Sequence, residues 1–169
     1  MEKLLWLNHH YIMNAEPEHV ARHLSWHMGQ LGLDLATGPA LVDVVKIQRE
    51  RSKTLVEMAA ASVYFYKEFE SYDEKAVKKN FTAGTEHVLS SLHERLIAVT
   101  DWNAESIHDV IVNLAESMTL NMGKVAQPLR VAVCGCAVSP AIDITVELLG
   151  QEKTLARLER AISYIKTLN

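Results

Sequence analysis

Hydrophobic residues recur at helical spacing along most of the chain. The clearest case is residues 103–118, where the apolar positions are Ile107, Val110, Ile111, Leu114 and Met118. A spacing of three or four residues places these side chains on one face of an amphipathic helix. Similar stripes predict helices over 2–13, 17–31 and 151–166. The pattern therefore predicts an all-α protein.

Two of these stripes assign individual side chains to the core. In 17–31 the apolar set is Val20, Leu24, Met28 and Leu31. In 151–166 a heptad-like seam consists of Leu155, Leu158, Ile162 and Ile165, with Lys153, Arg157 and Arg160 expected outward. The run RVAVCGCAV, from Arg130 to Val138, is rich in β-branched residues, but no partner strand is evident, so we predict a helix there too.

The helical patterns fall into two groups, separated by a charged segment. Residues 67–84 are rich in charge and end in glycine, which is typical of a boundary. We expect two small, packed helical lobes, 1–72 and 73–169.

Residues 121–150 contain closely spaced helix start and stop signals. Proline suits the first position of a helix, so Pro128 is expected to open a short helix that carries Arg130 and ends near Gly135. A second start is expected at Ser139-Pro140, where the hydroxyl would cap the helix. Exposed N–H groups and a helix dipole at such a junction suit a phosphate or a base edge. The alternative is an ordinary helix-turn-helix corner.

Composition and charge narrow the possibilities. A chain of 169 residues that is 49% hydrophobic can bury one core or two small ones. It has no apolar run long enough to cross a membrane and no signal peptide, so we expect a cytoplasmic protein. The net charge of −4 argues against nonspecific coating of nucleic acid, so any RNA site must be local.

One local excess of positive charge stands out in the first half. The cationic residues, offset only by Glu50, are Lys46, Arg49, Arg51 and Lys53. A charged stretch is usually a solvated helix face, but this one lies at a break between two helical patterns that Ser52 could cap. Its arginines are therefore expected to project from the end of an element.

Two groups of residues could suggest metal or redox chemistry, but we favour neither a metal site nor a redox site in this chain. His19, His23 and His27 share one helix face, but no nearby carboxylate or thiolate completes a site. Cys134 and Cys136 supply half of a tetrahedral zinc site and are too close for an unstrained disulfide. No nucleotide-binding or hydrolase motif is present, including the Walker A, G-x-G-x-x-G, G-x-S-x-G and H-E-x-x-H patterns.

Four collinear segments, KLLWLNHHYI, GKVAQPLRVAV, SPAIDITVELLG and LARLERA, together resemble one known family. This family is the bacterial glutamyl-tRNA synthetases of class I. The last three segments resemble its C-terminal, anticodon-binding part, and KLLWLNHHYI resembles the segment between its catalytic core and its tRNA-binding helices. The resemblance runs from Glu2 to Ile165. It implies a module that recognises the anticodon loop of glutamate tRNA and discriminates it from glutamine tRNA.

The resemblance also implies roles for single residues. Arg51, in RERSKTL, matches an arginine that reads the third anticodon base, and Arg130, in QPLR, matches another anticodon-contacting arginine. The loop that packs on the anticodon is matched by Ser139, Pro140 and Ile142. A further family arginine falls near Val112, which leaves that contact open.

The family's HIGH-like and KMSKS-like catalytic signatures are missing from this chain. No cofactor or metal is therefore expected here, whereas ATP and Mg²⁺ would belong to a catalytic domain of the parent enzyme, acting in cis. Residues 1–72 would join that side of the enzyme to the anticodon-binding lobe, 73–169, in a monomer. The competing hypothesis is a helical protein-interaction module that grips a partner through the Leu155–Ile165 seam or through Tyr64-Phe65-Tyr66.

Overall fold

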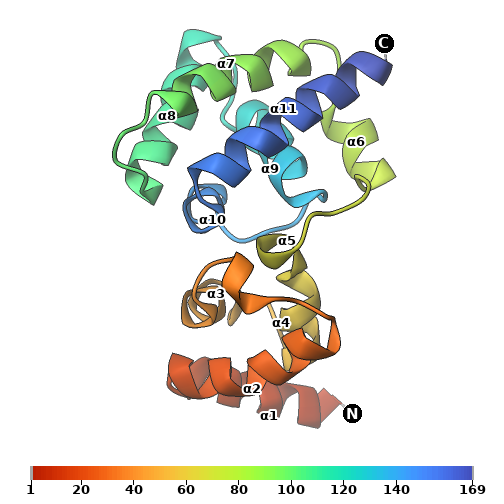
Figure 1. Ribbon diagram of the computed structural model, residues 1–169, viewed down its shortest axis with the longest axis vertical. Helices are drawn as coiled ribbons and strands as arrows, with labels where there is room; N and C mark the ends of the chain where they lie inside the picture. The colour runs from red at the N-terminus through yellow and green to blue at the C-terminus, as the bar shows by residue number, and fades with distance from the viewer. Residues whose placement is uncertain (1, 169) are drawn as a thin grey trace. The chain divides into compact units, whose positions relative to one another are not determined.

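The computed structural model describes residues 2–168, and all the regular secondary structure within that range is helical (Figure 1). The elements in chain order are α1 (Glu2–Asn14), α2 (Pro17–Gln30), η1 (Leu35–Thr37), α3 (Leu41–Gln48), α4 (Leu55–Ala61), α5 (Val63–Tyr66), α6 (Glu74–Asn80), α7 (Thr85–Ile97), α8 (Ala104–Ser117), α9 (Gly123–Cys134), α10 (Ile142–Leu149) and α11 (Gln151–Leu168). The all-α prediction is confirmed. None of these helices is both long and apolar enough to cross a membrane.

The chain separates into two compact units, Met1–Glu68 and Phe69–Asn169. We expected the division after residue 72, but it lies after Glu68. The aromatic side chains between these positions explain the difference. The rings of Phe69 and Tyr72 lie 5.3 Å apart, and Tyr72 lies 4.9 Å from Tyr164 of α11. The segment from Phe69 onward is thus bound to the second unit by aromatic packing.

In the first unit, α2 packs against α3 and α4. The buried side chains of α2 include Val20, Leu24 and Met28, as its apolar stripe predicts. Leu31 is 47% exposed, contrary to the prediction, because α2 ends at Gln30 and the chain then turns through Gly32, whose φ is +68°.

The helix expected after the charged cluster is broken in two at Ser62. The buried Ser62 hydroxyl donates to the carbonyl of Met58 at 2.7 Å, and the chain resumes as α5. Serine competes with the helical backbone in this way. The three aromatic residues of α5, Tyr64, Phe65 and Tyr66, are all buried, so they are core rather than a surface for a partner helix.

In the second unit, α9 is the central helix, packed against α6, α7, α8, α10 and α11 (Figure 1). Its residues Val125, Leu129, Val131 and Val133 are fully buried. The prediction of a helix in this apolar run is confirmed up to Cys134. Gly135 ends it in the left-handed conformation, with φ of +75°, also as predicted.

Three expectations about the second unit were wrong. Pro128 lies inside α9, which begins at Gly123, so the helix gives up one hydrogen bond, to the carbonyl of Lys124 in its exposed first turn. Ser139 does not cap α10, whose N-cap residue is Ala141. Arg157 is only 1% exposed rather than outward, and its neighbours on α11 in the core include Leu158 and Ile165.

Candidate functional site

Arg51 lies in the loop between α3 and α4, on the surface of the first unit. Its backbone N–H donates to the carbonyl of Gln48 at 3.0 Å. Its guanidinium forms no hydrogen bond or ion pair with any residue in 2–168. The structure therefore leaves a planar group of hydrogen-bond donors available to a ligand.

The loop that carries Arg51 is held on both sides by hydrogen bonds to its backbone groups. Asn8 Nδ2 of α1 donates to the carbonyl of Lys53 at 2.6 Å, and His9 Nδ1 lies 2.9 Å from the carbonyl of Ser52. Because a carbonyl only accepts, this contact places the proton of the imidazole on Nδ1. The Nη1 group of Arg49 donates to the carbonyl of Met13 at 3.2 Å. Helix α1 thus fixes the loop, although no pattern in the sequence linked these segments.

The second side of the loop is fixed by the start of α4. Thr54, not Ser52, is the capping residue, and its hydroxyl accepts from the N–H of Glu57 at 3.1 Å. The Glu57 carboxylate in turn accepts from the N–H of Lys53 at 2.8 Å. This reciprocal arrangement resembles a capping box and satisfies donors at the helix end. The expectation that Ser52 could cap this break was therefore wrong, and Ser52 is buried in the loop instead.

The second candidate surface is the corner between α9 and α10, residues 135–141. Arg130 donates from Nε to the hydroxyl of Ser139 at 2.8 Å and from Nη2 to the carbonyl of Pro140 at 3.4 Å. The Ser139 hydroxyl donates onward to the carbonyl of Pro140 at 2.8 Å. Arg130, Ser139 and Pro140 therefore lie together at this corner. Two of the five N–H donors of Arg130 are used in it, and the other three have no partner among residues 2–168.

The corner exposes a different apolar side chain from the one we singled out. Ile142 is 5% exposed and belongs to the core of the second unit, whereas Val138 is 71% exposed. The thiol of Cys136 donates to the carbonyl of Val138 at 3.2 Å and so helps to fix the turn. Sequence periodicity could not identify Val138, because it lies in an irregular segment between two helices.

An aromatic ring and a buried arginine support the corner from behind. The N–H of Asp73 donates to the carbonyl of Gly135 at 2.8 Å, and a Cβ at Gly135 would lie 2.9 Å from the Phe69 ring. Arg157 Nη1 donates to the carbonyl of Val133 at 2.6 Å, near the end of α9, and its guanidinium lies 5.2 Å from the centre of the Phe69 ring. These contacts explain why Arg157 is buried: it binds a helix-end carbonyl and an aromatic face.

The histidine and cysteine groups remain without a metal-binding arrangement in residues 2–168, where no three His, Cys, Asp or Glu side chains gather around one point. The rings of His19 and His23 lie 4.8 Å apart, but His27 lies against Trp26 instead. Both cysteines are free, and burial raises the pKa of the Cys134 thiol to about 12.

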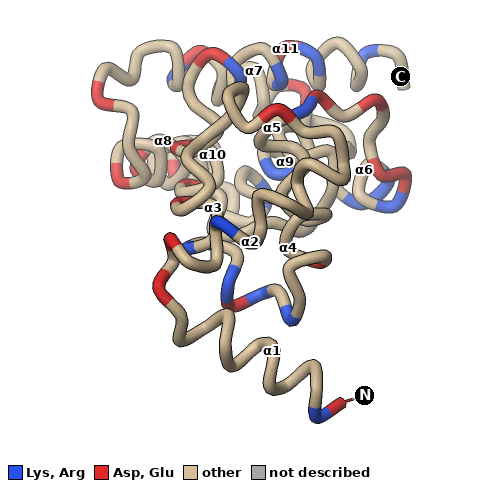
Figure 2. The backbone as a smooth tube through the Cα atoms, turned by 60° about the horizontal axis from the view of Figure 1, so that its bottom comes forward, with Lys and Arg blue, Asp and Glu red and all other residues tan. Residues whose placement is uncertain are grey.

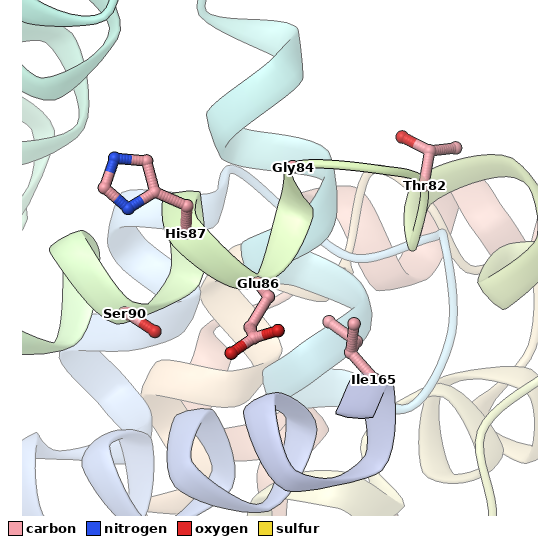
Figure 3. A pocket seen from close by; sticks show the side chains of 6 residues that line it. All are labelled: Thr82, Gly84, Glu86, His87, Ser90 and Ile165. Carbon is pink, nitrogen blue, oxygen red and sulfur yellow. The ribbon is translucent and has the colours of Figure 1, made fainter. Parts of the chain in front are cut away.

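A hollow of about 350 Å³ lies beside the start of α7 (Figure 3). It is lined by Thr82, Gly84, Glu86, His87, Ser90 and Ile165. Its carboxylate, Glu86, lies 3.6 Å from the Lys166 ammonium. Because this carboxylate offsets the nearby ammonium, the hollow has no excess of positive charge to attract phosphate, and we assign it no role in binding RNA.

Comparison with known proteins gives matches along nearly the whole chain. Glutamate–tRNA ligase 1 of Nitrosococcus oceani is 54% identical over 164 residues, covering 97% of this chain and 35% of that protein. Glutamate–tRNA ligase 2 of Halorhodospira halophila is 52% identical over 164 residues, again 97% of this chain and 35% of that protein. The crystal structure of a glutamate tRNA ligase from Elizabethkingia meningosepticum in complex with its amino acid superposes with a TM-score of 0.87 and 27% identity. That match covers 97% of this chain and 32% of the crystallised one.

The chain thus spans about a third of the length of these relatives. The resemblance to glutamyl-tRNA synthetases that the sequence motifs predicted is confirmed. Residues 18–162 match the family model described as the anticodon binding domain, which covers most of both units. The chain therefore belongs to the anticodon binding domain family.

Proposed function

We propose that this chain is the anticodon-recognition part of a glutamyl-tRNA synthetase, acting as a monomer in the cytoplasm, and that it selects glutamate tRNA over glutamine tRNA. Activation of glutamate with ATP and Mg²⁺ would then fall to a catalytic domain in the remaining length of the relatives. The single observation that carries the proposal is the Arg51 guanidinium, exposed and unpaired among residues 2–168, on a loop fixed from both sides.

The chemistry of two base edges explains how Arg51 would discriminate. The third anticodon base is C in glutamate tRNA and G in glutamine tRNA. Unpaired cytosine offers the adjacent acceptors N3 and O2, which a donor-only guanidinium can engage together. Guanine presents N–H donors on the corresponding part of its edge, so donor would face donor. RNA is read by sequence where bases leave the stack in this way.

We propose that Arg130 acts in the same recognition from the second unit. Its bonds to Ser139 and Pro140 hold the guanidinium at the corner, and three donors remain for phosphate or base. Val138 would supply apolar contact to an unstacked base, whereas Ile142 would act from the core by holding the start of α10.

The test uses two anticodon stem-loops that differ only in the third anticodon base. We expect the wild type to prefer C over G by about tenfold or more, as one paired contact to a base edge contributes roughly 1–3 kcal/mol in DNA recognition. Arg51→Gln should remove most of this preference, because an amide can turn its carbonyl toward guanine. Lys53→Gln is the matched control, since it removes the same charge from an exposed side chain in the same loop. It should weaken both complexes equally.

Two outcomes would contradict the proposal. A wild-type protein without preference for C would remove Arg51 as the discriminating residue. An equal loss of preference in Arg51→Gln and Lys53→Gln would show that net charge, not the planar donor group, separates the two RNAs. Circular dichroism should confirm that each variant keeps the helical fold.

A further inference from the structure

A small basic surface lies on α6 of the second unit. We call it the lysine face, and it consists of Lys75, Lys78 and Lys79. All three side chains are exposed, while Ala76 and Val77 of the same helix are buried. Successive residues of a helix are rotated by about 100°, so the three lysines share the side opposite the buried pair. Figure 2 shows the basic residues of α6 in blue.

The lysine face is not neutralised within the protein. None of its three ammonium groups forms an ion pair with a carboxylate of residues 2–168, although the chain carries a net charge of −4. The nearest acidic residues in sequence are Asp73 and Glu74. Asp73 is engaged as the N-cap of α6, where its carboxylate accepts from the N–H of Ala76 at 2.7 Å. Glu74 lies one helical turn before Lys78, at the edge of the lysine face.

The helix dipole explains only part of this arrangement. Lys78 and Lys79 lie in the last turn of α6, where a cation is favoured by the negative end of the dipole. Lys75 lies in the first turn, where the dipole favours acidic residues instead. The dipole therefore does not account for Lys75, and three unpaired ammonium groups on one face suit a ligand that carries several phosphate charges.

The lysine face is firmly attached to the corner that holds Arg130. The N–H of Asp73, immediately before α6, donates to the carbonyl of Gly135 at the end of α9. Helix α6 also packs along α9, the helix that carries Arg130. The lysine face and the corner therefore belong to the same compact unit.

We propose that the lysine face binds phosphodiester groups of the RNA, adjacent to the anticodon bases, and so sets the orientation of the loop on the second unit. This inference rests on the proposed function. Lysine suits the task because its ammonium is a compact point charge that binds phosphate without demanding one geometry. Contacts to phosphates position a nucleic acid but carry no sequence information.

The experiment measures the salt dependence of binding to the anticodon stem-loop of glutamate tRNA. The test variant is K75Q/K78Q/K79Q. The control is K3Q/K153Q/K166Q, which removes the same charge from α1 and α11. Each lost phosphate contact to single-stranded RNA should lower the slope of log affinity against log salt by about 0.7, so the test variant should lose about 2.

That change in slope has a direct consequence for affinity. Between 0.05 and 0.2 M salt, the ratio of wild-type to test-variant affinity should shrink by about twentyfold, whereas the control ratio should stay nearly constant. The preference for C over G at the third anticodon base should be the same in all three proteins, because the lysine face reads no base. Lys75→Gln alone should lower the slope by about 0.7 without lowering the melting temperature.

The outcomes separate this inference from the proposed function. If the wild type binds with the expected preference and the test variant keeps its full slope, the lysine face does not contact RNA, while anticodon recognition stands. A slope that falls equally in test and control variants also overturns the inference, since it shows a general charge effect. If the wild type binds no stem-loop at any salt concentration, both proposals fail. If the test variant has a lower melting temperature than the wild type, Lys75→Gln takes its place. A full wild-type salt slope in Lys75→Gln would then overturn the inference.

Discussion

Gly135→Ala tests the packing behind the α9–α10 corner. At this position φ is +75°, and a left-handed backbone costs an L-residue about 1–2 kcal/mol relative to glycine. The new Cβ would also lie 2.9 Å from two atoms of the Phe69 ring, a distance that requires the ring or the turn to move. Overpacking of this kind costs about 1–3 kcal/mol more. We therefore expect the free energy of unfolding to fall by about 2–5 kcal/mol in total.

The ring cannot move aside freely, because Arg157 and Arg160 lie over it at 5.2 and 4.5 Å from its centre. Gly84→Ala provides a matched control in the same unit. Gly84 has a similar backbone, with φ of 86° and ψ of −12°, but nothing lies within 4 Å of the position that a Cβ would take there. It should therefore lose only the backbone contribution of about 1–2 kcal/mol.

Denaturant unfolding followed by circular dichroism measures both changes. The Phe69→Ala background then isolates the collision in a double-mutant cycle, since removal of the ring should reduce the cost of Gly135→Ala to that of Gly84→Ala. Equal costs for Gly135→Ala and Gly84→Ala in the wild-type background would refute the collision with Phe69. A cost for Gly135→Ala that survived in the Phe69→Ala background would point to strain elsewhere in the turn.

Two further predictions concern buried polar groups of the second unit. The hydroxyls of Thr145 and Thr154 are fully buried and have no hydrogen-bond partner among residues 2–168. Replacing either residue by valine should therefore raise the free energy of unfolding by about 1 kcal/mol, measured by urea titration. A loss of stability in either variant would show that the hydroxyl has a hydrogen-bond partner. Burial, and to a smaller extent the neighbouring Cys136, raises the pKa of the Cys134 thiol to about 12. The contribution of this thiol to stability is therefore complete below about pH 9, where the unfolded thiol is still protonated. It is lost as the pH rises toward 12. Alkaline unfolding of Cys134→Ala should accordingly depend less steeply on pH above 9 than that of the wild type, and identical slopes would contradict the assignment.

The sequence predicted those parts of the fold that depend on local patterns. The stripe of α8 correctly identified Ile107, Ile111 and Leu114 as buried, and Asn103 caps that helix by accepting from the N–H of Ser106 at 2.9 Å. Periodicity and capping act within a few residues, so one sequence is enough to recognise them. The end of α9 at Gly135 belongs to the same class, because a glycine in the left-handed conformation is a local signal for the end of a helix.

Features set by tertiary contacts could not be predicted in this way. Helical spacing placed Arg157 on the outer side of α11, but the carbonyl of Val133 and the ring of Phe69 provide partners that only the folded unit brings together. Pro128 was expected to open a helix, yet α9 starts at Gly123. Val125 and Ala126 lie before the proline and are buried, so their packing outweighs one lost hydrogen bond. Local rules fail where packing outweighs propensity.

The candidate site also combines predictable and unpredictable features. The two arginines were identified from sequence motifs. Asn8 and His9, which hold the Arg51 loop, could not be identified because they are far from it in sequence, and Ser139, which binds Arg130, was expected to cap a helix instead. Val138 had no signal at all, since exposure in an irregular turn depends on where the chain packs.

The two arginines also differ in how an RNA would engage them. Arg130 is already held by Ser139 and Pro140, so it loses little freedom when it binds. Arg51 has a fixed backbone but an unrestrained side chain, and ordering it costs up to about 2 kcal/mol of rotamer entropy. This cost is comparable to the gain from one base contact, so Arg51→Gln can change the affinity for a single RNA very little. The same cost applies to both RNAs when each orders the side chain, and it then cancels in their ratio. The preference between the two stem-loops, rather than the affinity for either, is therefore the quantity that reveals what Arg51 reads.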